Sequence, residues 1–359
     1  MSEQTLTSAA AGRGPLAMEA ISLSKVFRIG RGQMLHAVRD VSFNLYRGAV
    51  VALVGESGSG KSTAARLLAG QERLTSGTIR LDGQQVEVSG RRDFRRYKSQ
   101  VQLVFQDPFS SLNPIHTVRY HLERPVKLHQ GRDVQVDQEV VSLMEQVRLT
   151  PARPFLAKYP HELSGGQRQR VSFARALAAH PSVLLADEPV SMLDVSIRLE
   201  MLSLLDDLRR RFQLAMLYIT HDIASARYFA DEVLVMYAGE IVERGPAEEV
   251  TQQPAHPYTQ PLVASAPDPD NLGSTLRRAA GPAGNGAANG TGRPKPHQAG
   301  QVAATGCPFS PRCPLAEDRC RAEDPALIPI TDTRGAACWR LDVAAPELVS
   351  GRAGTENTR

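Results

Sequence analysis

Residues 55–62 read Gly55-Glu56-Ser57-Gly58-Ser59-Gly60-Lys61-Ser62, and this stretch decides the fold of the 359-residue chain. It follows the apolar run Ala49–Val54, which predicts a buried parallel strand. It leads into Ser62–Ala69, a segment of good helix formers that stops at Gly70. A glycine-rich turn between a strand and a helix directs several N–H groups and the positive helix end at one anion. The sequence therefore predicts a phosphate-binding loop.

Two side chains of this loop carry the expected chemistry. Lys61 can reach the outer phosphates of a nucleotide, and Ser62 supplies a hydroxyl group for Mg²⁺. The simpler interpretation is a glycine-rich turn, but a complete phosphate-loop pattern between a strand and a helix favours nucleotide binding. The candidate nucleotide-binding residues of this loop are Gly55, Glu56, Ser57, Gly58, Ser59, Gly60, Lys61, Ser62 and Thr63.

A second motif places two carboxylates at the end of another buried strand. Residues 182–186 are apolar enough for a central strand, and Asp187 and Glu188 follow at its carboxyl end, where open α/β sheets bind ligands. Asp187 suits a role in holding Mg²⁺, and Glu188 suits a carboxylate that orients or deprotonates the attacking water. An acidic pair that only caps the next segment is the alternative, which the phosphate loop disfavours.

A third motif begins a helix. Ser164-Gly165-Gly166-Gln167 has the pattern of a capping box, in which Ser164 and Gln167 satisfy the first N–H groups of the helix. The apolar positions 171, 174, 177 and 178 continue that helix. A helix start that offers a serine hydroxyl and glycine N–H groups can also bind an anion. The two interpretations are compatible.

Together these motifs resemble the nucleotide-binding subunit of an ATP-binding-cassette (ABC) transporter, over about residues 18–265. The resemblance implies an α/β fold of the P-loop NTPase class. It consists of a RecA-like core with an antiparallel β subdomain and a helical subdomain. It also implies ATP hydrolysis with ATP and Mg²⁺, in a head-to-tail dimer. Each ATP then lies between one subunit's phosphate loop and the other subunit's Ser164, Gly165, Gly166 and Gln167.

The same resemblance assigns further residues. Phe27 occupies the position that stacks on adenine, Gln106 the position that senses Mg²⁺ and the γ-phosphate, and His221 the position that contacts the γ-phosphate. Asp194 matches the aspartate that communicates between the two sites. Glu188, His221 and Gln106 are thus the expected catalytic residues, and Ser62, Gln106 and Asp187 the expected Mg²⁺ site.

Two of these assignments have structural alternatives. Phe27 could be a core residue at a strand end. Asp194 could be the N-cap of an amphipathic helix. The expected apolar face of that helix consists of Val195, Leu199, Leu202, Leu205 and Phe212.

Two segments narrow the resemblance. Residues 106–114 and 256–262 are similar to segments of oligopeptide, dipeptide and nickel importers. This similarity implies an ATPase that powers peptide import, with nickel or another small solute as the alternative cargo. The implied partners are integral-membrane permease subunits, a second ABC ATPase subunit in a homo- or heterodimer, and indirectly a substrate-binding protein. The implied location is the cytoplasmic face of the cell membrane.

Composition bears on the competing functions. The chain has a formal net charge of +4 and no apolar stretch near the roughly 18–20 residues that cross a bilayer. A basic group at Arg91, Arg92, Arg95, Arg96 and Lys98 is expected to be a solvated helix face. A soluble ABC ATPase acting on nucleic acid or the ribosome is the rival class. The chain has one cassette and no sustained heptads between its motifs, so we expect no nucleic-acid partner.

The expected organisation has five parts. Residues 1–17 form a flexible tail, 18–265 the ABC ATPase domain, 266–303 a linker, 304–345 a cysteine-containing region of the oligopeptide-importer type, and 346–359 a second tail. The linker is predicted because residues between Leu276 and Val302 include no large aliphatic or aromatic side chain.

All four cysteines lie beyond that linker, at Cys307, Cys313, Cys320 and Cys338. Disulfides are disfavoured by a reducing cytoplasm. Four thiolates can bind zinc, although the short hooks usual for zinc are missing, or an iron–sulfur cluster, and free thiols are the third possibility. The stretch 306–314 resembles the carboxyl-terminal region of peptide-importer ATPases, some of which bind a 4Fe–4S cluster there. The resemblance makes that cluster the expected ligand.

Overall fold

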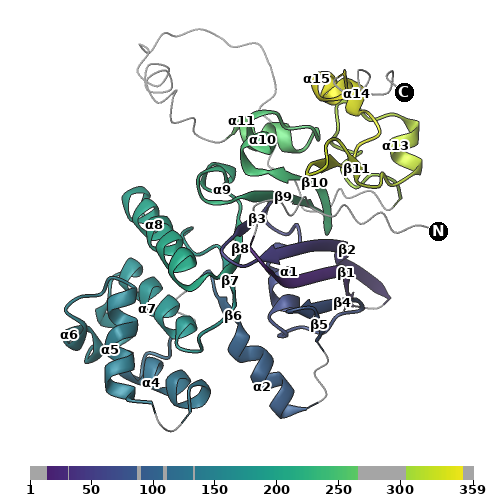
Figure 1. Cartoon of the computed structure of the whole chain (residues 1–359). Coiled ribbons are helices and arrows are strands. Elements are labelled where there is room, and N and C mark those ends of the chain that lie inside the picture. Colours follow the sequence, from purple (N-terminus) through teal and green to yellow (C-terminus); the bar gives the residue numbers. More distant parts are fainter. Residues whose placement is uncertain are drawn as a thin grey trace, which may run out of the picture.

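The computed structural model of the protein describes residues 14–30, 32–86, 90–107, 111–131, 134–265 and 305–350. The expected linker, most of both tails and residues 108–110 of the importer-like segment lie outside these ranges. Figure 1 shows a central sheet with a smaller sheet beside it, a group of helices at one end and a small region near the C-terminus at the other.

The central sheet joins the cassette to the C-terminal region. Its eight strands follow the order β11-β12-β10-β9-β3-β8-β7-β6 in the described residues. The pairs β9–β3, β3–β8, β8–β7 and β7–β6 are parallel. The bounds are β3 (Val50–Val54), β6 (Val101–Val104), β7 (Val183–Asp187), β8 (Ala215–Thr220), β9 (Glu232–Tyr237), β10 (Glu240–Pro246), β11 (Ile328–Pro329) and β12 (Gly335–Ala336). Strands predicted at 49–54 and 182–186 are confirmed.

Successive side chains of a strand point to opposite faces of the sheet, so the apolar core forms two clusters, one on each face. Val50, Ala52 and Val54 face a cluster shared with the helices, whereas Val51 and Leu53 face a cluster shared with the smaller sheet. Both faces are apolar because this parallel sheet is covered on both sides.

The smaller sheet is antiparallel, with the order β2-β1-β4-β5. Helix α1 packs between this sheet and the central sheet through the apolar cluster that they share. Strand β1 begins at Leu16, so the cassette starts two residues earlier than the predicted boundary at residue 18. The bounds are β1 (Leu16–Ile29), β2 (Gln33–Tyr46), β4 (Ser76–Leu81), β5 (Gln84–Gln85) and α1 (Lys61–Leu68).

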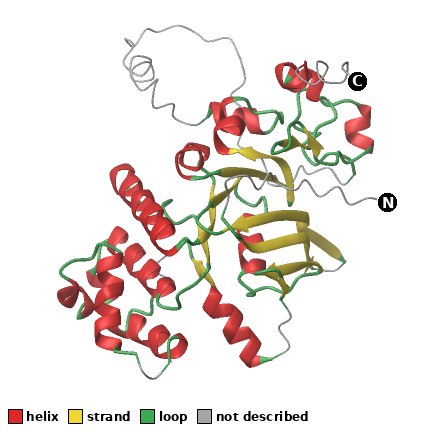
Figure 2. Ribbon diagram, in the orientation of Figure 1, coloured by secondary structure: helices red, strands yellow, loops and turns green. Residues whose placement is uncertain are grey.

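The remaining helices of the cassette cover the other face and one end of the central sheet (Figure 2). Helices α4 to α7 form a helical subdomain, and α8 packs on the core through Leu202, Leu205 and Leu208. The prediction for the apolar face of α8 was partly wrong, because Leu199 and Phe212 are 54% and 37% exposed. The bounds are α2 (Arg91–Gln100), α4 (Val118–His129), α5 (Val136–Gln146), α6 (Ala152–Leu156), η1 (Pro160–Glu162), α7 (Gly165–Leu177), α8 (Val195–Phe212), α9 (Ile223–Phe229), α10 (Ala247–Gln252) and α11 (Thr259–Ala264).

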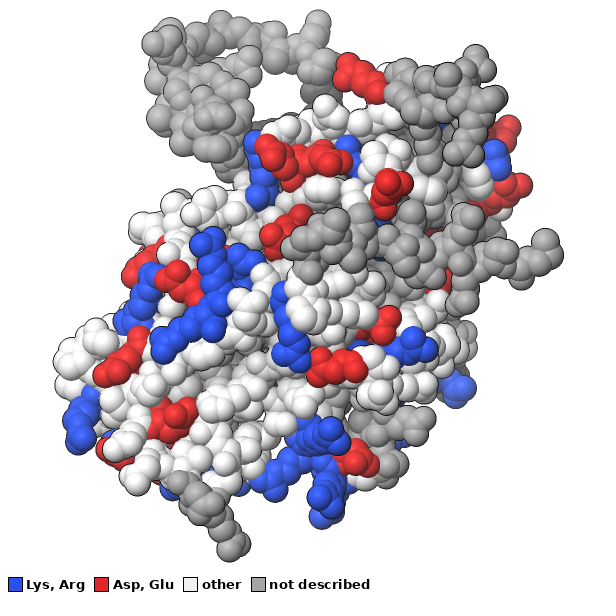
Figure 3. Space-filling view, in the orientation of Figure 1, with Lys and Arg blue, Asp and Glu red and all other residues white. Residues whose placement is uncertain are grey.

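The basic helix α2 is solvated at its four arginines, as the sequence predicts. The prediction was wrong for Lys98, which is part-buried and donates a hydrogen bond to the carbonyl oxygen of Ala69. Arg91, Arg92, Arg95 and Arg96 are all exposed. Figure 3 shows Lys and Arg side chains gathered at the lower edge of the molecule, where α2 lies in Figure 1. Within the described ranges, no helix combines the length and the apolar content that crossing a membrane requires.

The C-terminal region is built onto the edge of the central sheet. Strand β12 pairs with β10, and β11 extends the sheet by one more short strand. Helix α15 occupies residues that the sequence assigned to a tail. The bounds of the helices are α13 (Asp318–Ala322), α14 (Leu341–Ala344) and α15 (Pro346–Ser350).

A buried ion pair anchors this region. Arg334 Nη2 lies 3.0 Å from Glu243 Oε1, with side-chain exposures of 1% and 0%. The Glu243 carboxylate also accepts the backbone N–H groups of Ala255 and His256, both at 2.9 Å. Arg334 donates a further hydrogen bond to the carbonyl oxygen of Gln253. Burial of two charges is tolerated because each is paired and hydrogen-bonded.

We expect Arg334→Ala to lower the free energy of unfolding of the C-terminal region by roughly 3–5 kcal/mol, because it leaves a carboxylate buried without its cation. Urea unfolding followed by the fluorescence of Trp339, the single tryptophan, measures this change. Arg321→Ala is the matched control because it breaks only the exposed pair with Asp318. The control should leave the midpoint nearly unchanged, and an equal loss in both variants would contradict the prediction.

Candidate functional site

The phosphate loop is shaped by glycines that no other residue could replace without displacing backbone. Gly60 precedes α1 with φ 107°, in the left-handed region. A Cβ atom at Gly60 would lie 2.2 Å from the carbonyl oxygen of Ala37, and one at Gly55 would lie 2.2 Å from that of Met236. The loop therefore packs directly against β2 and β9.

Lys61 lies inside this loop. Its Nζ donates to the carbonyl oxygens of Gly55 and Glu56, at 2.7 and 2.8 Å. Burial lowers the pKa of the Lys61 ammonium, and the nearby carboxylates of Glu188, Asp187 and Glu56 oppose that shift. The ammonium is thus a fixed, shielded positive charge at the start of a helix, where an anion is favoured.

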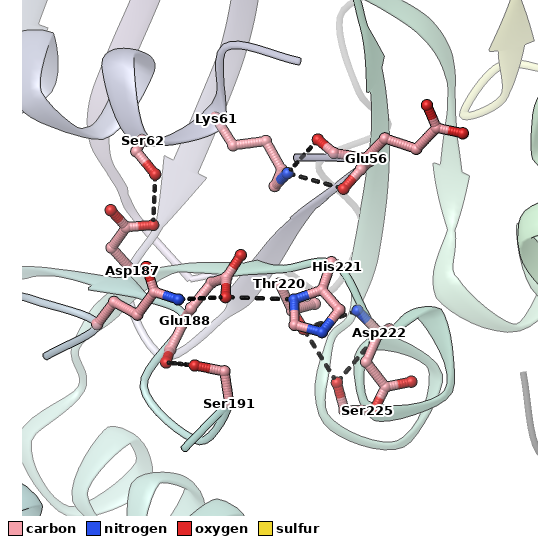
Figure 4. Close-up of polar contacts among 12 residues, drawn as sticks. Glu56, Lys61, Ser62, Asp187, Glu188, Ser191, Thr220, His221, Asp222 and Ser225 are labelled. Atoms are coloured by element: carbon pink, nitrogen blue, oxygen red, sulfur yellow. Dashed lines mark hydrogen bonds and ion pairs between the residues drawn. The ribbon is translucent and has the colours of Figure 1, made fainter. Parts of the chain in front are cut away.

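A serine hydroxyl and a carboxylate meet between α1 and β7. Ser62 Oγ lies 3.0 Å from Asp187 Oδ1, and Figure 4 shows both side chains close to Lys61. Burial raises the pKa of Asp187, and the hydrogen bond from Ser62 opposes that shift. These hard oxygen donors fit Mg²⁺. The structure thus brings together two of the three residues expected to bind Mg²⁺, which lie 125 positions apart.

Glu188 links three further parts of the chain. One carboxylate oxygen of Glu188, Oε2, accepts a hydrogen bond from Gln106 Nε2 at 2.9 Å and lies 3.2 Å from His221 Nδ1. Gln106 follows β6, Glu188 follows β7 and His221 follows β8, so the three parallel strands deliver these side chains to one edge of the sheet. Figure 4 shows Glu188 and His221 pointing toward one another. The three expected catalytic residues therefore converge on one atom.

The backbone around Glu188 is constrained. Its φ is +45°, a left-handed conformation that is uncommon for a residue with a side chain. Its N–H donates to the carbonyl oxygen of Ile219 at 2.9 Å, and its carbonyl accepts from Ser191 Oγ at 3.0 Å. These contacts hold the turn that aims the carboxylate.

His221 is positioned by residues that the sequence motifs did not single out. The N–H of Asp222 donates to Thr220 Oγ1 at 3.0 Å. Asp222 then caps α9 by accepting the N–H of Ala224, also at 3.0 Å. Ser225 Oγ donates to the carbonyl oxygen of Asp222 at 2.8 Å. The N-cap pattern of Asp222 before Ile223 was a signal that could have located this turn.

The predicted capping box at α7 is confirmed. The N–H of Gln167 donates to Ser164 Oγ at 3.3 Å, and the N–H of Ser164 donates to Gln167 Oε1 at 3.0 Å. Gly165 and Gly166 form the first turn of α7. Figure 1 shows that α7 and α1 lie apart within the chain. The two anion-binding helix starts therefore do not form one pocket in a single chain.

Phe27 and Asp194 lie outside the hydrophobic core. Phe27 is part-buried near the end of β1, and the ammonium group of Lys25 lies 4.7 Å from its ring centroid. Asp194 occupies the N-cap position of α8, but its side chain makes no capping hydrogen bond and is exposed. The core alternative therefore does not hold for Phe27, whereas Asp194 is the N-cap residue of α8, as its alternative has it, without a side-chain hydrogen bond. The functional roles of both residues stay predictions.

The segment 256–262 contacts the phosphate loop. The N–H of Glu56 donates to Tyr258 Oη at 2.8 Å. Tyr258 is buried, and its ring packs against Tyr237 and Phe309. His256, also buried, accepts the N–H of Tyr258 at 3.0 Å, and burial lowers the pKa of His256 to about 4. From the sequence, this segment carried only a resemblance to importer ATPases.

The four cysteines surround one small cavity beside His256 and Trp339. Burial raises the pKa of the Cys307 thiol to about 12 and that of Cys338 to about 11, and it also raises the pKa of Cys313. All four are free thiols. No group of three or more His, Cys, Asp or Glu side chains in the described ranges is arranged to hold one metal ion. The four thiols line one shielded space, and burial favours the protonated form of the three whose pKa it raises.

Comparison with known proteins decides the family. Residues 38–191 match the family described as ABC transporter, and residues 242–320 match the oligopeptide/dipeptide transporter C-terminal region. A probable peptide ABC transporter ATP-binding protein of Sinorhizobium fredii is 40% identical, covering 92% of this chain and 91% of that protein. The chain belongs to the ATP-binding subunits of peptide ABC transporters.

Other members of this family and solved cassettes agree. The di/tripeptide transport ATP-binding protein DppF of Pseudomonas aeruginosa is 39% identical, covering 90% of this chain and 98% of that protein. The structure of cbiO1 from Clostridium perfringens has a TM-score of 0.59 at 26% identity and covers 67% of this chain and 92% of that one. A dimeric cassette bound to ADP and phosphate has a TM-score of 0.58 at 26% identity, covering 64% and 98% of the two chains. The predicted fold class is confirmed.

Proposed function

We propose that this chain hydrolyses ATP to power the import of di- or oligopeptides through a membrane-spanning ABC transporter. The observation that carries the proposal is the convergence of Gln106 and His221 on Glu188, beside the Ser62–Asp187 pair. The names of the relatives support the cargo, since several are peptide import or dipeptide transport ATP-binding proteins. Nickel or another small solute is the alternative cargo.

The chain's own residues supply positioning and charge. We assign Lys61 and the loop of residues 55–63 to binding the phosphates of ATP, and Ser62, Asp187 and Gln106 to holding Mg²⁺. When bound, Mg²⁺ neutralises charge on the β- and γ-phosphates. Glu188 orients the attacking water and accepts its proton, and His221 contacts the γ-phosphate. Phe27 stacks on adenine.

The second half of the ATP site comes from another subunit. Because α7 lies apart from α1 in one chain, Ser164, Gly165, Gly166 and Gln167 would face the phosphate loop of a partner cassette. Asp194 would connect the two sites. The dimeric cassette bound to ADP and phosphate supports this arrangement by its similarity. The partner is a second copy or a related ATPase subunit.

The proposed assembly places the chain at the membrane. Integral-membrane permease subunits bind it at the cytoplasmic face, and a substrate-binding protein delivers cargo to those subunits. The names of the Sinorhizobium and Pseudomonas relatives support a transporter, and neither name mentions nucleic acid or the ribosome. We therefore favour peptide import over the rival class of soluble ABC ATPases.

We also propose that Cys307, Cys313, Cys320 and Cys338 hold a 4Fe–4S cluster. Their convergence on one cavity supports this assignment, because four thiolates are the usual ligands of such a cluster. Cys307 and Cys338 are also buried, which shields a bound group from water. Zinc and free thiols are the alternatives.

We expect Glu188→Gln to slow ATP turnover by roughly 10²–10⁴-fold while ATP still binds, because it removes the proton acceptor and leaves the phosphate loop intact. Steady-state phosphate release and equilibrium ATP binding by the assembled transporter measure the two effects. Glu249→Gln, the same change at an exposed position of α10, is the control. A wild-type rate of ATP turnover in Glu188→Gln would contradict the assignment of Glu188 as the proton acceptor.

The cargo is tested by reconstitution of the chain with its permease partners in vesicles. We expect a peptide-loaded substrate-binding protein to stimulate ATP turnover and to deliver labelled peptide to the vesicle lumen. The Glu188→Gln complex serves as the negative control. Stimulation by nickel-loaded binding protein, with no response to peptides, would support the alternative cargo and overturn peptide import.

The metal is tested by anaerobic purification. We expect a brown protein with about four iron atoms and four sulfides per chain. Cys313→Ser and Cys320→Ser should lose iron, whereas Ser310→Ala, which retains every thiol, should keep it. A colourless protein with stoichiometric zinc would contradict the cluster and support a zinc site. A metal-free protein would contradict both metals and support free thiols.

A further inference from the structure

We propose that Arg312 is a positioning residue for ATP binding: the C-terminal region holds the phosphate loop of the same chain through Arg312. Arg312 lies in the cysteine-containing region, 256 positions from its partner Glu56. The inference goes beyond peptide import and requires only that the chain hydrolyses ATP.

The contact between Arg312 and the loop is a two-point ion pair. Arg312 Nη1 lies 2.9 Å from Glu56 Oε2, and Nη2 lies 2.9 Å from Oε1. The two side chains are 18% and 41% exposed. A bidentate pair of this geometry fixes both distance and orientation, unlike a single surface contact.

The guanidinium is itself held in place. Its Cζ lies 5.7 Å from the ring centroid of Tyr237 and 5.6 Å from that of Phe309. The rings of Tyr258 and Phe309 lie 5.5 Å apart, and Tyr258 Oη accepts the N–H of Glu56. One aromatic cluster therefore constrains both Arg312 and the backbone of Glu56.

Glu56 is placed where its charge and its backbone both affect ATP. Its carbonyl oxygen accepts a hydrogen bond from Lys61 Nζ at 2.8 Å. Its carboxylate is close enough to act electrostatically on the Lys61 ammonium. A negative charge at this point would repel a polyphosphate, so Arg312 favours ATP binding by offsetting the charge of Glu56.

The turn that contains Arg312 also contributes residues that line the cavity between the cysteines. The N–H groups of Arg312 and Cys313 both donate to the carbonyl oxygen of Phe309, at 2.9 and 3.0 Å. Cys313 and Phe309 line the cavity. A change at the cysteines that moves this turn would move the guanidinium that contacts Glu56.

The test is steady-state ATP hydrolysis by the assembled full-length transporter. We expect Arg312→Ala to raise the KM for ATP roughly three- to tenfold, the range for loss of one well-formed ion pair, with kcat changed by less than about twofold. Arg312→Lys, which keeps the charge but loses the two-point geometry, should give a smaller increase. Arg321→Ala, which removes a positive charge from the same region by breaking the exposed pair with Asp318, is the matched control.

A second variant separates charge from structure. Adding Glu56→Gln to Arg312→Ala removes the negative charge that Arg312 offset and should bring the KM most of the way back. Trp339 fluorescence checks that the C-terminal region remains folded in each variant. An unchanged KM in folded Arg312→Ala, or a double variant as impaired as the single one, would overturn the proposal. If Trp339 fluorescence shows that Arg312→Ala unfolds the C-terminal region, the KM of Arg312→Lys becomes the test. An unchanged KM in folded Arg312→Lys would then contradict the proposal.

Discussion

The parallel register of β3, β7 and β8 is the constraint on which the site depends. Val54 lies opposite Thr220, and Asp187 lies opposite Ile219, so the three strands end at the same edge of the sheet. The loops that leave this edge carry Lys61, Glu188 and His221. Each of these strands is fully buried, so burial of their side chains on both faces fixes the register that aligns the chemistry.

Sequence could predict the parts of the site that are local. The phosphate loop, the capping box at Ser164 and the strand before Asp187 each depend on neighbours within a few residues. The contact of Gln106 and His221 with Glu188 depends on strand order, which resemblance supplied and periodicity could not. The face of α8 was misjudged at Leu199 because helical spacing alone does not say which of two adjacent stripes meets the core.

The contacts that sequence could not predict join distant segments. An arginine is usually exposed, yet Arg334 is buried against Glu243, which lies in β10. The prolines around Arg312 indicate only a turn, yet its side chain binds Glu56 in the phosphate loop. The Arg334 pair arises because β12, which begins at the next residue, pairs with β10, and that pairing of two residues carries almost no sequence signal.

The architecture gives the phosphate loop two supports of different kinds. Within the cassette, the backbone of β2 packs against Gly60 and that of β9 against Gly55, so closely that a methyl group at either glycine would collide with a carbonyl oxygen. At Glu56, Tyr258 from the end of the cassette binds the N–H group, and Arg312 from the C-terminal region binds the carboxylate. The first support is rigid, since it rests on packed strands, whereas the second passes through a turn lined by thiols. A structural change in the C-terminal region would therefore reach the phosphate loop at Glu56, next to the carbonyl oxygens that hold Lys61.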